Sequence, residues 1–315
     1  MPTEPQKDII DIANRTQAHT VATQRLNALS RGFVALSLDY GFHIENNFGE
    51  HKINNLRNNI IYRLESALFH CELLLREHAA IEHHLKNVLA NDPQKVLGFF
   101  YPQNPNFEIA ERKASFIFDS IVFHTASIFD YVSILITFLS IKDRDQTLHW
   151  SKIASSARKD DHELYKKLVA KTIDRIDRDF VTRLYAHRSE LIHQRPDMAE
   201  NAFQIQPMTG TFNIRFVAAA KVHKTFRTHI DQDTNWSVAY FSYWIVNKAA
   251  EVIADLLFDL KVDIENNSAF SQHTYADGSK PVMIYVDPET KQMKSPSTEI
   301  WPEFYKFFPL KTDNT

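Results

Sequence analysis

Glycine is scarce in this chain, and its scarcity excludes two large classes of nucleotide enzyme. Only 6 of the 315 residues are glycine, and no two of them lie within four residues of each other. The Rossmann fingerprint and the Walker A loop both need clustered glycines, because the backbone must approach a phosphate closely. We therefore expect neither kind of nucleotide site.

Cysteine is also nearly absent. The single Cys71 cannot form a disulfide within the chain or supply a cysteine-based zinc site. A lone cysteine fits a reducing compartment, so we expect a cytoplasmic protein. The net charge of −3 makes the whole chain no general binder of polyanions, although a local basic patch is compatible with it.

No metal site is expected either. The densest histidine cluster is His78, His83 and His84, and in it only His78 and Glu82 have a four-residue spacing on one helix face. A zinc site needs three or four converging ligands. We interpret the cluster as a solvated helix surface, and we predict no metal and no cofactor.

No membrane anchor is expected from the hydropathy pattern. The first twelve residues carry acids and prolines and lack the apolar core of a signal peptide. The most apolar stretch, residues 120–141, is long enough to span a bilayer, but His124 and Asp130 interrupt it. A helix buried in a protein core explains the same pattern, and this is the prediction.

Long apolar periodicities predict a mostly α protein, a helical bundle with a small β-hairpin and minor β additions. Apolar residues recur at helical spacings over residues 52–91 and again over 108–141. Alternation over 203–216 predicts the hairpin. Residues 33–45 also alternate, which predicts a strand, with a helix as the rival interpretation because Gly41 interrupts the pattern.

Three consecutive regions are predicted along the chain. Residues 1–107 form an N-terminal helical region, residues 108–264 form the bundle with its hairpin, and residues 265–315 form a C-terminal extension. A proline-rich connector, which includes Pro93 and Pro102, separates the first region from the second.

The segment most informative about function is LYAHRSELIHQRPD, residues 184–197. Arg188 is followed after four residues by His193, near the end of a helix that Pro196 terminates. A guanidinium is a permanently charged fork that matches a phosphate, and an imidazole exchanges protons near neutral pH. The pair is suited to phosphodiester chemistry without a metal.

This segment resembles the motif of the HEPN superfamily, helical-bundle proteins whose nuclease members carry an Arg, four to six residues and then a His. Tyr185, one turn before the Arg, is similar to the family pattern. The resemblance covers about residues 108–264 and implies a metal-independent endoribonuclease or an RNA- or nucleotide-binding protein. It also implies that Arg188 binds the scissile phosphate and that His193 shuttles a proton during attack by the RNA 2′-hydroxyl.

Two features leave alternatives open. Ser189 stands where nuclease members usually place Asn, Asp or His. The motif spacing also occurs after Arg63, Arg76 and Arg144, so chance supplies it, and Arg144 is followed by the preferred Asp. Arg188 and His193 also have a structural explanation, in which the Arg pairs with an acid such as Asp130 and the His caps its own helix. The competing hypothesis is a non-catalytic interaction or scaffold module.

Helix geometry limits how the two motif residues can act. Residues five apart are rotated by about 140°, so Arg188 and His193 do not share one face of an ideal helix. They can act together at a helix end or in a groove between two subunits. Family members form a symmetric dimer, so the resemblance implies a homodimer that takes RNA as its ligand.

A basic stripe precedes the motif. Lys171, Arg175 and Arg178 follow one another at four- and three-residue steps along a helix, a spacing that matches contacts along an RNA backbone. Aspartates at 174, 177 and 179 interleave with them. Ion pairs within the helix are therefore the alternative interpretation.

Overall fold

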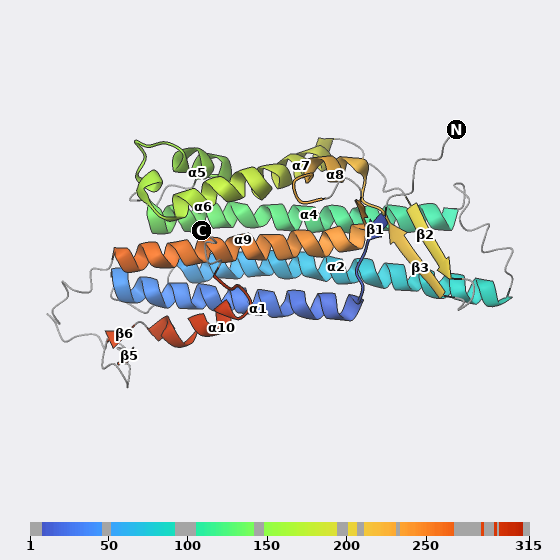
Figure 1. Ribbon diagram of the computed structural model, residues 1–315, viewed down its shortest axis with the longest axis horizontal. Coiled ribbons are helices and arrows are strands. Elements are labelled where there is room, and N and C mark those ends of the chain that lie inside the picture. The colour runs from blue at the N-terminus through green and yellow to red at the C-terminus, as the bar shows by residue number, and fades with distance from the viewer. Residues whose placement is uncertain are drawn as a thin grey trace. The chain divides into compact units, whose positions relative to one another are not determined.

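The computed structural model describes residues 8–45, 52–91, 105–141, 148–193, 201–206, 211–230, 234–267, 285–286, 293–294 and 296–310. Helices account for most of these residues (Figure 1), so the prediction of a mostly α fold is confirmed. The chain divides into two compact units. The motif unit, which contains Arg188 and His193, comprises Met1–Ala22, Glu65–Ala126 and Asp179–Val246. The C-terminal unit comprises Thr23–Leu64, Ser127–Arg178 and Asn247–Thr315.

Both units are built from segments that are distant in the sequence. Four long helices contribute residues to each unit: α1 (Arg15–Tyr40), α2 (Lys52–Asn91), α4 (Pro105–Ser140) and α9 (Val238–Asn266). α2 and α4 confirm the two long helices predicted from the sequence. Their buried residues recur every three to four positions, as Leu56, Ile60 and Leu64 do on α2. The division into three consecutive regions stays a prediction.

α4 is the one helix among the described residues that is long and apolar enough to cross a membrane. Within its most apolar eighteen-residue window, 61% of the residues are buried inside the protein. Core helices pass the same test of length and composition, and burial accounts for the apolar character of this one. The absence of a membrane anchor stays a prediction.

The predicted strand over 33–45 is wrong. α1 continues through this segment, and the π-helix η1 (Gly41–Glu45) extends it. Phe33 and Leu36 are buried three residues apart, and Asp39, which alternation placed on the outer face, is completely buried three residues later. Burial therefore follows the helical period of 3.6 and not the strand period of two.

The motif unit adds short elements around its helices. They are β1 (Asp8–Ile10), α7 (Thr182–His193), β2 (Asn201–Gln206), β3 (Thr211–Phe216), α8 (Ala220–Thr225) and β4 (Thr234–Trp236). β1 and β4 pair in parallel, and β2 and β3 pair antiparallel with Asn201 opposite Phe216. The predicted hairpin is thus confirmed in its strands, while its turn at 207–210 lies outside the described residues.

The C-terminal unit adds short helices and one more strand pair. They are α5 (Trp150–Ala157), η2 (Glu163–Lys166), α6 (Val169–Ile176), β5 (Tyr285–Val286), β6 (Met293–Lys294), η5 (Pro296–Glu299) and α10 (Trp301–Tyr305). The buried Asp39 of α1 accepts a hydrogen bond from Trp301 Nε1 at 2.7 Å. A Cβ at Gly32 would lie 2.6 Å from the Phe304 ring. The glycine therefore lets α10 pack directly against α1.

Candidate functional site

α7 carries both motif residues. Arg188 lies in the middle of this helix and His193 is its last described residue. The π-helical turn η3 (Asp177–Val181) precedes α7 directly, and π-turns inside helical segments are often found at functional sites. The side chain of His193 lies outside the described part of the structure, so the geometry of the site is built from the residues around Arg188.

The inner face of α7 is held by an aromatic cluster. Leu184 is completely buried and His187 is 4% exposed. The His187 ring contacts Phe118 of α4, with ring centroids 6.1 Å apart, and Phe226, which follows α8, at 6.2 Å. Edge and tilted ring contacts of this kind stabilise a core. His187, the residue directly before the motif Arg, is therefore part of the packing of the motif unit.

Arg188, the next residue of α7, packs against Phe123 of α4. Its guanidinium carbon lies 6.0 Å from the centroid of the Phe123 ring, and its Nε atom is buried. A cation over an aromatic face is attracted by the ring quadrupole and keeps its full charge. The contact holds the guanidinium of α7 against α4.

Polar contacts fix α7 against α8. Arg183 donates a hydrogen bond to the backbone oxygen of Thr225 at 3.1 Å. Lys221 Nζ lies 3.3 Å from a carboxylate oxygen of Glu190. Together with the buried inner face, these contacts determine the orientation of α7 within its unit.

The remaining predicted site residues have different surroundings. Tyr185 is half-buried and Ser189 is exposed on α7. Asp130 lies on the part of α4 that belongs to the C-terminal unit, and its backbone oxygen accepts a hydrogen bond from Ser133 Oγ at 2.8 Å. The pairing of Asp130 with Arg188 stays a prediction. The second-ranked Arg144 lies outside the described residues.

The basic stripe of the sequence is largely engaged in ion pairs. Arg175 bonds Asp255 of α9 at 2.7 Å. Arg178 bonds Asp174, four residues before it, with Nε at 3.0 Å. Lys171 is exposed and lines a groove of about 770 Å³ between α6, α9 and the C-terminal segment. Two of the three residues predicted to bind RNA therefore have carboxylate partners within the C-terminal unit.

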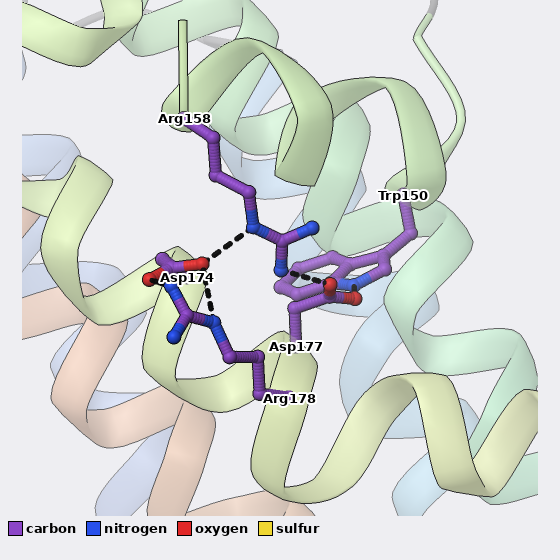
Figure 2. A network of polar contacts seen from close by, with 5 residues as sticks. All are labelled: Trp150, Arg158, Asp174, Asp177 and Arg178. Carbon is purple, nitrogen blue, oxygen red and sulfur yellow. Dashed lines mark hydrogen bonds and ion pairs between the residues drawn. The ribbon is translucent and has the colours of Figure 1, made fainter.

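A closed polar network lies beside that stripe. Figure 2 shows the Arg158 guanidinium between the carboxylates of Asp174 and Asp177. Its Nε atom lies 2.5 Å from Asp174 Oδ1, and its Nη2 atom lies 2.5 Å from Asp177 Oδ2. The buried Asp177 also accepts a hydrogen bond from Trp150 Nε1 at 2.8 Å. Burial alone would raise the pKa of Asp174, but the hydrogen bonds from Arg158 and Arg178 outweigh it and hold that pKa below its ordinary value. The network joins α5 to α6 and to the start of η3.

The three histidines of the α2 cluster differ in exposure. Among the described residues, no group of three or more His, Cys, Asp or Glu side chains could hold a metal ion. His83 and His84 are exposed, as expected for a solvated face. That interpretation is wrong for His78, which is only 2% exposed. The centroid of its ring lies 5.1 Å from that of Phe216, and burial lowers its pKa to about 4. Glu82 is held by Arg15 at 2.8 Å.

One half-buried carboxyl of α4 was missed by reasoning from the sequence. Asp119 lies on α4 next to Phe118 and one turn before Phe123, the two residues that contact α7. Burial raises the pKa of Asp119 to about 6. The signal available in the sequence was an isolated acid within the apolar stretch of α4, but without the packing of α7 that acid had no identifiable neighbour.

Comparison with protein-family models, with curated proteins and with solved structures gives no match to this chain. The functional argument therefore depends on the residues of α7 and their surroundings.

Proposed function

We propose that the protein is a HEPN-like, metal-independent endoribonuclease that acts through α7. The observation that carries this proposal is that α7 holds Arg188 against Phe123, five residues before His193 and eight before Pro196, a residue that cannot continue a helix. A helix end is one of the two places where residues five apart can act on the same group despite their rotation of about 140°. Arg188 has the charge and planar shape that a phosphate requires.

The chemistry follows from the two residue types. Arg188 binds the non-bridging oxygens of the scissile phosphate and stabilises the charge that accumulates there. His193 accepts the proton of the RNA 2′-hydroxyl while its oxygen forms a bond to phosphorus. The bond from phosphorus to the 5′-oxygen breaks, a proton is returned to that oxygen, and the other product ends in a 2′,3′-cyclic phosphate.

The proposal includes a homodimer formed through the face of α4 beside Arg188. Ile109, Phe116 and Phe123 are seven residues apart and form one line along α4, which we name the α4 stripe. Ile109 is 52% exposed and Phe116 is 63% exposed, while Arg188 lies over Phe123. A seven-residue apolar repeat is typical of helix-to-helix packing. A second copy packed on this stripe would bring two α7 helices toward one cleft.

A cytoplasmic location belongs to the same proposal. Cys71 is buried, and burial raises the pKa of its thiol, so the thiol stays protonated and unreactive. A chain with one buried thiol gains no stability from an oxidising compartment.

A second candidate function is a non-catalytic scaffold. The observation that favours it is the packing of Arg188, whose Nε is buried and whose guanidinium lies on Phe123, next to a core residue His187. In this alternative Arg188 stabilises the contact between α7 and α4 and takes no part in catalysis.

The test is cleavage of a single-stranded RNA by the whole protein in the presence of a chelator. We expect fragments with 2′,3′-cyclic phosphate ends and no cleavage of the matching DNA, which lacks the 2′-hydroxyl nucleophile. Sedimentation at tens of micromolar should show a dimer that Phe116→Glu converts to monomers. RNA left intact by a wild type that is dimeric would favour the scaffold, and a wild-type monomer would contradict the composite cleft.

A further inference from the structure

Three aspartates form a row along α9 and face α6. Asp255, Asp259 and Asp263 are four residues apart, which places them on one side of the helix. Asp255 bonds Arg175 of α6 at 2.7 Å. Asp263 accepts hydrogen bonds from two backbone N–H groups at the start of α6, at 3.0 and 3.2 Å. The first and the last acid of the row are therefore held by α6.

The middle acid of the row has no cation of its own. Asp259 is half-buried and accepts a hydrogen bond from Thr172, but it forms no ion pair within the residues that the structure describes. The nearby cation of Arg175 is already bound to Asp255. Burial raises the pKa of Asp259, and the charges of Asp263 and Asp255 add to the rise. The hydrogen bond from Thr172 and the charge of Arg175 oppose this rise without cancelling it. The ionised form of Asp259 is thus short of one positive charge.

Asp259 lines a groove of the C-terminal unit. The groove has a volume of about 770 Å³ and lies between α6, α9 and the C-terminal segment. This volume is within the range of about 300–1,000 Å³ that is usual for small-molecule pockets. Phe258 and Tyr305 also line the groove, with ring centroids 6.3 Å apart and ring planes at 73°. Leu168 and Leu310, both exposed, add apolar surface to its walls. The groove therefore combines one uncompensated carboxylate with aromatic and aliphatic walls.

The other charged groups that line the groove do not compensate Asp259. Arg175 and Asp255 neutralise each other through their ion pair. Lys171 is exposed, and water and salt screen its charge. A ligand that is complementary to the groove therefore brings one positive charge and an apolar body. An ammonium group forms a charge-assisted hydrogen bond with a carboxylate and is also attracted by the faces of aromatic rings.

We propose that this groove binds a small organic cation, a primary ammonium on an apolar body, through the carboxylate of Asp259. The ammonium donates a hydrogen bond to that carboxylate, and the body packs against Phe258 and Tyr305. The bound cation compensates a charge that burial otherwise penalises, so the charge of the ligand decides its affinity. The inference concerns the C-terminal unit and does not depend on the proposed nuclease activity of α7.

The experiment compares two probes that differ in charge. Phenethylamine is an ammonium near neutral pH, whereas phenethyl alcohol has the same apolar body and no charge. Isothermal titration calorimetry with the full chain, near neutral pH and at low salt, measures the affinity for each probe. We expect the amine to bind at least roughly tenfold more tightly than the alcohol, because the amine alone supplies the missing charge.

Three variants locate the site. Asp259→Asn removes the charge and keeps the shape of the side chain, so it should bind the two probes about equally. Asp119→Asn makes the same change at a half-buried acid of α4 that also forms no ion pair among the described residues, and it should keep the wild-type preference for the amine. Leu168→Ser changes an exposed position of the groove wall. It should weaken both probes by a similar factor of roughly three and leave their ratio unchanged.

The outcomes separate a charged site from general apolar binding. Equal affinity of the wild type for both probes would overturn the proposal, and so would no binding of either probe up to about 10 mM. An amine preference that survives in Asp259→Asn, or that is lost in Asp119→Asn, would place the cation elsewhere and overturn it as well. Leu168→Ser tests the groove without changing the acid, and unchanged affinity for both probes in this variant would contradict the proposed location.

Discussion

Two polar regions of this protein use the same residue types for different ends. In the C-terminal unit, Asp174 and Asp177 are bound by Arg158, and Asp177 also by Trp150 (Figure 2). In the motif unit, Asp119 lies half-buried on α4 and has neither a hydrogen bond nor an ion pair among the described residues. The pKa of Asp174 is lowered, whereas burial raises that of Asp119 to about 6.

The difference is in what each carboxylate contributes to the stability of the fold. A carboxylate held by several donors favours its ionised form and stabilises the folded state. A carboxylate buried without donors costs stability whenever it is ionised, and strongly perturbed groups of this kind are concentrated at functional sites. The first arrangement stabilises the fold, and the second leaves a carboxyl with a pKa of about 6.

The largest expected effect concerns catalysis by α7. His193→Ala should lower the rate of RNA cleavage by roughly a hundredfold or more, because it removes the group that moves the proton. Arg188→Lys should also be damaging, since lysine keeps the charge but cannot make a two-pronged phosphate contact. The measurement is single-turnover cleavage of a labelled RNA in the presence of a chelator.

The control for that prediction must lie on the exposed side of α7. Ala186→Ser meets this condition and should leave the rate within about twofold, since exposed substitutions of this size have little effect on packing. His187→Ala is unsuitable, because His187 is buried in the aromatic cluster and its loss would create a cavity. Cleavage that is unchanged in both His193→Ala and Arg188→Ala would show that the motif is not catalytic.

The next effect concerns the stability of the polar network. Asp177→Ala should lower the free energy of unfolding by about 2 kcal/mol, because it leaves Trp150 Nε1 and the Arg158 guanidinium without their shared acceptor. Asp160→Ala removes an exposed carboxyl of the same unit and should change the free energy of unfolding by less than about 0.5 kcal/mol. Denaturant unfolding measures both variants, and equal losses would contradict a structural role for the network.

The fold was predictable where apolar spacing was long and was not predictable where it was short. Helices α2 and α4 repeat their buried positions over 40 and 36 residues, so the helical period is unmistakable. The error at 33–45 arose because six alternating apolar residues are also compatible with a helix that is buried on more than one side. In α1, for example, the adjacent residues Ala35, Leu36 and Ser37 are all buried. Asp39 is the informative case, since it is buried by Trp301, a residue more than two hundred positions away.

For the candidate site, the sequence supplied only the motif residues Arg188 and His193, whose role stays a prediction. Local spacing could not show that α4 meets α7 through Phe118 and Phe123. The basic stripe was visible in the sequence, but the partners of its residues were not. The acid that holds Arg175 lies on α9, eighty residues away. Tertiary partners of charged residues are not encoded in local spacing.

A smaller effect is expected when the charge of Asp119 is removed. Its folded-state pKa of about 6 exceeds the unfolded value of about 4, so its contribution to stability is present below pH 4 and is lost as the pH rises through 6. Asp119→Asn should therefore raise the free energy of unfolding at pH 7.5 by about 1 kcal/mol, a figure reduced for partial exposure. At pH 4 the variant and the wild type should be equally stable. A variant less stable than the wild type at pH 7.5 would mean that the carboxylate has a favourable partner.

The smallest effect is expected at the surface of the network. Arg178 is 67% exposed and bonds Asp174, which Arg158 also holds. Arg178→Ala should lower the free energy of unfolding by about 0.3–0.5 kcal/mol, the usual range for exposed pairs four residues apart on a helix, and 1 M salt should remove most of that loss. Arg158→Ala, which strips both carboxylates of a donor, should cost several times more and should depend less on salt. If Arg178→Ala cost as much as Arg158→Ala, the carboxylates of this region would be less completely satisfied than their contacts indicate, and the contrast with Asp119 would lose its basis.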